Sequence, residues 1–162
     1  MSRNFARAFV RHPDARTKRW LPDATVPNTW VTPWSHHTIT RLDHAVHAAG
    51  WDSLLIDPDC IDGRADVEEL VAFHYQLVRE RYERALQLAR PIHYGRRVLL
   101  MLGALPRTSP GMHQLNVIAC HGAPAGIHLG LDLSLHEHTS TMFHHYITGI
   151  YTGCSTRSAR AS

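Results

Sequence analysis

Apolar and polar residues alternate strictly along residues 127–138, IHLGLDLSLHEH. Apolar side chains occupy every second position from Ile127 to Leu135. Most positions between and beyond them are polar: His128, Asp132, Ser134, His136 and His138. A period of two over this length predicts a β-strand with one face buried and the other in contact with water.

Two other segments have the spacing of three and four residues that is typical of an amphipathic helix. The first covers residues 38–49 and ends at Gly50. The second begins after Asp66, where Asp66 and Glu69 form a predicted capping pair, and should end before Pro91. Its apolar stripe is Val67, Leu70, Val71, His74, Leu77, Val78 and Tyr82.

Strands are predicted at 51–56, 97–105, 114–121 and 127–138, and the tail over 139–153 favours one more. Turn-like PRTSPG and HGAPAG separate the middle three, which suggests an antiparallel meander. Residues 20–35 hold three prolines and three tryptophans and should lie extended over the domain. The expected fold is therefore α+β, with a long central helix packed against or wrapped by an antiparallel β-sheet.

Composition favours one ordinary globular domain of a bacterial cytoplasmic protein. We expect a basic arm over 1–20, a single domain over 21–153 and a frayed tail over 154–162 of the 162 residues. The longest apolar run, 98–105, is too short for a membrane span. The three cysteines form no CxxC pair, which fits a reducing compartment, and the near absence of lysine suggests a GC-rich genome.

Positive charge is concentrated at the N-terminus. Six basic residues face one aspartate in the first twenty, whereas the formal charge of the whole chain is only +3. The sequence argues against nucleic acid as a partner, because the tryptophans that follow lack basic neighbours beyond Arg19. One alternative function is therefore a non-catalytic interaction domain whose basic arm recruits a partner protein.

Residues 85–107 contain an Arg-Pro-aliphatic step (Arg90, Pro91, Ile92), then Gly95 and a strand that begins near Val98. This segment resembles the hairpin of hotdog-fold acyl-thioester enzymes, in which a long helix is followed by such a strand, a glycine turn and a second strand. Residues 113–135 then look like the next hairpin. The resemblance implies a hotdog-like homodimer that hydrolyses or dehydrates a thioester of coenzyme A or of a carrier protein, without a required cofactor.

In that family the catalytic carboxylate or histidine lies near the start of the long helix. The resemblance therefore suggests Asp66, Glu69 and His74 as catalytic residues. The same residues have a purely structural interpretation, since Asp66 and Glu69 can cap the helix and His74 can belong to the core.

A metal site is the second functional alternative. On a strand, His136 and His138 would share one side, about 7 Å apart, and could hold a divalent metal with Asp132 or His121. The spacing of Gly130, His136, His138, Met142 and Gly149 resembles the first metal-binding motif of cupin barrels, with methionine in place of the family's glutamate.

Two further interpretations of the histidines stay open. They can form the polar outer face of a half-buried sheet, for example at a subunit interface. The segments His36-His37-Thr38 and His138-Thr139-Ser140 are also similar to the paired His-x-Thr/Ser elements of two-histidine phosphoesterases.

Overall fold

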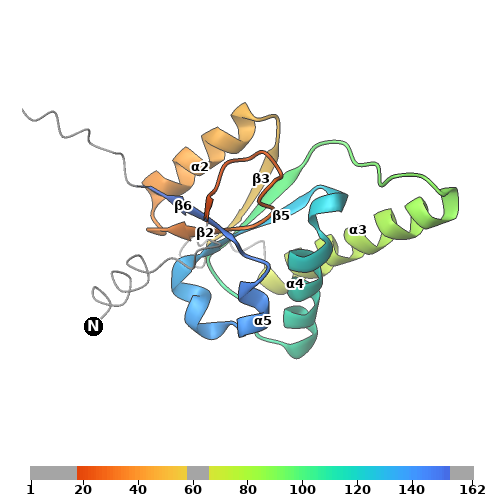
Figure 1. Ribbon diagram of the computed structural model, residues 1–162. Coiled ribbons are helices and arrows are strands. Elements are labelled where there is room, and N and C mark those ends of the chain that lie inside the picture. Colours follow the sequence, from red (N-terminus) through yellow and green to blue (C-terminus); the bar gives the residue numbers. More distant parts are fainter. Residues whose placement is uncertain (1–17, 58–65, 154–162) are drawn as a thin grey trace, which may run out of the picture.

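The computed structural model describes residues 18–57 and 66–153. Figure 1 shows the chain folded around one sheet. In order, the elements are β1 (Lys18–Arg19), β2 (Thr29–Thr32), α2 (His36–Ala48), β3 (Asp52–Ile56), α3 (Val67–Leu88), β4 (Val98–Leu102), α4 (Ser109–His121), β5 (Ile127–Asp132), α5 (Thr141–His144) and β6 (Gly149–Thr152). Two short 3-10 helices, η1 (Ala123–Ala125) and η2 (Leu133–His138), flank β5.

The six strands lie in the order β1-β6-β2-β5-β4-β3, and every neighbouring pair is parallel. The predicted α+β fold with an antiparallel, hotdog-like sheet is therefore wrong. Parallel neighbours need a connection that returns the chain to the same end of the sheet, and α2, α3 and α4 supply three of these connections. The result is an α/β architecture.

Helices cover both faces of the sheet (Figure 1). On one face, α2 packs Ile39, Leu42 and Val46 against a cluster that includes Leu99 and Met101 of β4. The other face carries α3, α4 and α5, whose core side chains meet the alternate residues of β4 and β5. The central strands consequently bury both of their sides.

This burial explains the alternating segment 127–138. Only its first half is a strand, since β5 ends at Asp132 and η2 follows. The side chain of His128 is fully buried although the pattern predicted a water-exposed position. Strands of a parallel sheet are covered on both faces, so a polar residue in the alternation does not mark a wet side.

The predicted strand 114–121 is wrong as well, because it lies inside α4. Thr108 caps this helix by accepting a hydrogen bond from the backbone N–H of Gly111, and Pro110 stands in its first turn. Thr-Ser-Pro is a helix start signal that the turn interpretation of PRTSPG overlooked. Leu115, Ile118 and Ala119 then face the core with helical spacing.

Other predictions are confirmed. The helix over 38–49 is α2, the one after Asp66 is α3 and ends at Leu88, and 51–56 contains β3. The stripe of α3 is also correct, with Val71, His74 and Val78 fully in the core. Nearly all of the basic arm and the tail over 154–162 lie outside the described residues. No helix in the described part of the chain is long and apolar enough to cross a membrane.

Candidate functional site

The connections after β2 and β5 diverge at the carboxyl ends of these strands. The two strands are neighbours, with Val31 opposite Asp132. After β2 the chain turns to α2 on one face, whereas after β5 it passes through η2 and α5 on the other. We call this place the switch point. In open parallel sheets, ligands bind outside the carboxyl ends of the strands where such a divergence occurs.

The first turn of α2 lies on one side of the switch point. Its cap is Ser35, whose hydroxyl oxygen accepts a hydrogen bond of 3.2 Å from the N–H of Thr38. His36 and His37 follow, both exposed, and the turn contains no acidic residue. The N–H groups at a helix start carry partial positive charge, so this turn is electrostatically suited to an anion.

The starts of α3 and α4 are different, because acidic side chains already occupy them. Asp66 caps α3, and Glu68 and Glu69 stand in its first turn. Glu68 also reaches across to α4, where one carboxylate oxygen accepts hydrogen bonds from the backbone N–H groups of Arg107 (2.6 Å) and Thr108 (3.0 Å). The bonds from Thr108 and Arg107 lower the pKa of Glu68.

A glycine makes this contact between α3 and α4 possible. A Cβ atom on Gly111 would lie 2.1 Å from the second carboxylate oxygen of Glu68 and 2.9 Å from the hydroxyl of Thr108. The start of α4 is thus filled by a carboxylate of the same chain.

Asp132, η2 and α5 form the other side of the switch point. The Asp132 carboxylate accepts a hydrogen bond of 3.0 Å from the N–H of Ser134. The rings of His136 and His144 stack with centroids 3.7 Å apart, and the ring of Trp30 meets His136 edge-on at 5.2 Å. Burial lowers the pKa of His136, and the neighbouring His144 lowers it further. This side therefore favours the neutral form of His136.

The three residues suggested as catalytic share one end of α3 but not one environment. Asp66 caps the helix by accepting a hydrogen bond of 3.1 Å from the N–H of Glu68, and Glu69 is exposed. His74 is buried, with Nδ1 2.8 Å from the carbonyl oxygen of Leu70, and burial lowers its pKa. Structural roles therefore account for Asp66 and His74.

The four proposed metal ligands do not converge. Asp132, His136 and His138 lie at the carboxyl edge, but His121 ends α4, which runs back to the opposite edge. His136 and His138 also lie on a 3-10 helix, where residues two apart point in different directions. No group of three potential metal ligands occurs among residues 18–57 and 66–153.

At the amino edge of the sheet, polar side chains are buried and bonded. Nδ1 of His128 lies 2.7 Å from the carbonyl oxygen of Pro27 and must donate to it. Nε2 is then the acceptor for Arg97, at 3.0 Å. The ring stacks on Trp51 with centroids 4.5 Å apart. Burial lowers the pKa of His128 to about 4, the Arg97 charge contributing less.

Asn28 connects four segments at the same edge. Its amide nitrogen donates to the carbonyl oxygens of Ala119 (2.9 Å) and Tyr146 (2.8 Å), and its oxygen accepts from the N–H of Leu129 (3.0 Å). Nothing in the hydrophobic pattern marks Asn28 or His128 for this role.

A cavity of about 330 Å³ opens between the C-terminal half of α3 and the loop 89–97 that returns to β4. Figure 1 shows this part of α3 projecting beyond the sheet. Its lining combines apolar side chains with charged ones: Leu77, Glu80, Arg81, Arg84, Ala85, Leu88, Arg90, Pro91, His93, Tyr94 and Gly95. In the sequence, the Arg90–Gly95 segment carried only the hotdog resemblance, and no pattern pointed to this cluster.

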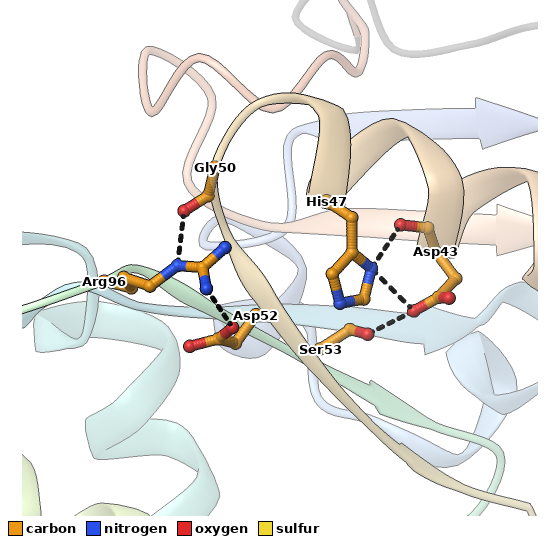
Figure 2. Close-up of polar contacts among 6 residues, drawn as sticks. All are labelled: Asp43, His47, Gly50, Asp52, Ser53 and Arg96. Carbon is orange, nitrogen blue, oxygen red and sulfur yellow. Dashed lines mark hydrogen bonds and ion pairs between the residues drawn. The ribbon is translucent and has the colours of Figure 1, made fainter.

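A serine, a histidine and an aspartate also meet between α2 and β3 (Figure 2). The Ser53 hydroxyl donates to the Asp43 carboxylate, and Nδ1 of His47 lies 3.3 Å from the same oxygen of Asp43. In a hydrolytic triad the histidine stands between the other two, so that it can take the serine proton. Here the aspartate stands between them, and the cluster lacks that geometry.

Helices on both faces of a parallel sheet, with a switch point at its carboxyl edge, define the protein as an open α/β protein. No family model, curated protein or solved structure matches the chain. Functional conclusions therefore depend on its own residues.

Proposed function

We propose that the protein binds a small anionic molecule at the switch point, beyond the carboxyl ends of β2 and β5. The observation that carries this proposal is the divergence of the two connections to opposite faces of the sheet. In open α/β sheets, ligands bind in the crevice at such a divergence. The proposal therefore does not depend on membership of a particular family.

The charge of the ligand follows from the first turn of α2, since the Asp132 carboxylate across the switch point already accepts a hydrogen bond from Ser134. The first turn of α2 has two exposed imidazoles and no carboxylate, whereas acidic groups serve the starts of α3 and α4. An anionic group can accept hydrogen bonds from the N–H groups of α2 and from His36 or His37. These imidazoles can also move a proton to or from the bound molecule.

Acyl-thioester processing stays an untested prediction. It was suggested by a hotdog resemblance, and the parallel sheet removes the fold on which the roles of Asp66, Glu69 and His74 depended. The metal-dependent alternative likewise lacks a convergent ligand set in the described part of the chain.

The test is a titration of ¹⁵N-labelled full-length protein with pyrophosphate, followed by NMR. Amide signals of residues 35–38 and 133–136 should shift together with one dissociation constant. In the His36→Ala/His37→Ala variant these shifts should be strongly weakened. Shifts that occur only elsewhere, or shifts at 35–38 that the double variant retains in full, would contradict the proposal.

A further inference from the structure

The cavity beside α3 lies at the opposite edge of the sheet from the switch point. It is formed by the C-terminal half of α3 and by the loop that precedes β4, so its walls are independent of β2, β5 and α2. Its volume of about 330 Å³ is within the size range of sites for small molecules.

Three guanidinium groups line this cavity, against one carboxylate, that of Glu80. Within the part of the chain that the structure describes, Arg81, Arg84 and Arg90 have no ion-pair partner. By contrast, Arg79 on another side of the same helix is paired with Glu83 at 3.3 Å. The lining thus has a formal charge of +2, which matches a phosphate monoester dianion.

Arg81 is the innermost of the three and is partly fixed. It donates a hydrogen bond to the carbonyl oxygen of Ala125, and its guanidinium carbon lies 6.0 Å from the ring centroid of Tyr94. Burial lowers the pKa of Arg81, which means that its charge has lost part of its hydration. An anion in the cavity would restore that stabilisation.

The remaining wall is mostly apolar. Tyr94 packs against Gly126, where an added Cβ would lie 2.5 Å from the ring, and Arg97 covers the Tyr94 ring at 4.8 Å. Leu77 and Leu88 come from α3, and the side chain of Leu88 is 56% exposed. An exposed leucine beside unpaired arginines offers contact area to the non-polar part of a ligand.

We infer that this cavity is a binding site for a small organic phosphate, with the phosphate held by Arg81, Arg84 and Arg90 and an apolar body against Leu77, Leu88 and Tyr94. Guanidinium groups bind phosphate through paired hydrogen bonds that lysine cannot make. The site is separate from the switch point, so the protein can bind two molecules at once.

The probe for this site is phenyl phosphate, compared with inorganic phosphate and with phenol. Isothermal titration calorimetry of the full-length protein should give tighter binding of phenyl phosphate than of either fragment. NMR should place the shifts at residues 77–97. Equal affinity for inorganic phosphate would show that the apolar wall contributes nothing and would overturn the organic part of the inference.

Matched variants test the arginines. Arg84→Gln/Arg90→Gln should weaken the binding of phenyl phosphate about tenfold or more, because glutamine lacks the positive charge and the paired hydrogen bonds that guanidinium makes to phosphate. Arg79→Gln removes one positive charge from α3 outside the cavity and should leave the affinity unchanged. Equal affinities in the wild type and the double variant would refute the site, as would much tighter, competing binding of an RNA oligonucleotide.

Discussion

The two edges of the sheet use the same kinds of polar side chain for different purposes. At the amino edge, Asn28 and His128 are buried, and each of their hydrogen bonds joins segments distant in sequence. At the carboxyl edge, His36, His37 and His138 are exposed. A histidine therefore has no fixed meaning, because burial and available partners decide whether it supports the fold or can meet a ligand.

Removing the buried hydrogen bonds at the amino edge should have the largest effect on stability. Asn28→Ala leaves two carbonyl groups and one N–H group unbonded in the core, and we expect a loss of about 3 to 5 kcal/mol in unfolding free energy. Denaturant unfolding measures it. Ser134→Ala, at the exposed carboxyl edge, is the reference and should change stability by less than about 0.5 kcal/mol. Similar losses of unfolding free energy in both variants would contradict the proposed difference between the two edges.

His128 should give the amino edge a pH dependence of stability. Its pKa falls from 6.5 to about 4 on folding, so the unfolded chain binds the proton more tightly. Its contribution, about 3 kcal/mol, is complete above pH 6.5 and is lost as the pH falls toward 4. Melting temperatures of the wild type and His128→Asn should converge over this range, since asparagine can keep the bond to Pro27 without titrating. A difference in melting temperature that stays the same at all pH values would show that His128 is not the source of the pH dependence.

The contact between Glu68 and the start of α4 is a hydrogen-bonded polar structure at the carboxyl edge. Gly111→Ala should displace Glu68, because the new methyl group would occupy its place. We expect the melting temperature to fall by about 2 to 4 °C, the shift for loss of one helix cap in a chain of this size. Ala104→Gly, a change in size outside this contact, serves as a comparison. An unchanged melting temperature in Gly111→Ala would mean that Glu68 contributes nothing there.

The smallest effect on stability is expected for His36→Ala/His37→Ala. Both side chains are exposed, and Ser35 keeps the cap of α2, so unfolding free energy should change by less than about 0.5 kcal/mol. Circular dichroism during thermal unfolding measures this. A large loss of stability would show that the two histidines support the fold and would weaken their assignment to a ligand.

Several local elements could be predicted from the sequence because their signals lie within a few residues of each other. The stripe of α3, its start after Asp66 and its end before Pro91 are examples, as is the Gly50 end of α2, where φ is +80°. The strand predicted at 114–121 was wrong although the signal for the helix there is also local. Thr-Ser-Pro at 108–110 starts the helix, but these residues were interpreted as part of a turn.

The site could be predicted only in part. The sequence pointed to Asp66, Glu69, Asp132, His136 and His138 as chemically active, and all of them lie at the carboxyl edge. It could not separate them from His121, which belongs to the other edge, because the direction of α4 depends on the pairing of β4 with β5. The cavity was missed because its arginines come from a helix and a loop whose facing sides only the fold brings together.

The sequence by itself determined where α2 and α3 lie, which of their sides are apolar, and that positive charge collects at the N-terminus. Tertiary structure alone decided that the strands are parallel and that both faces of β5 are covered. It also decided that His128 is buried while His36 is exposed. The physical reason is range: caps, turns and periodicity act between residues a few positions apart, whereas strand pairing, burial and the partners of a polar group depend on contacts between distant segments.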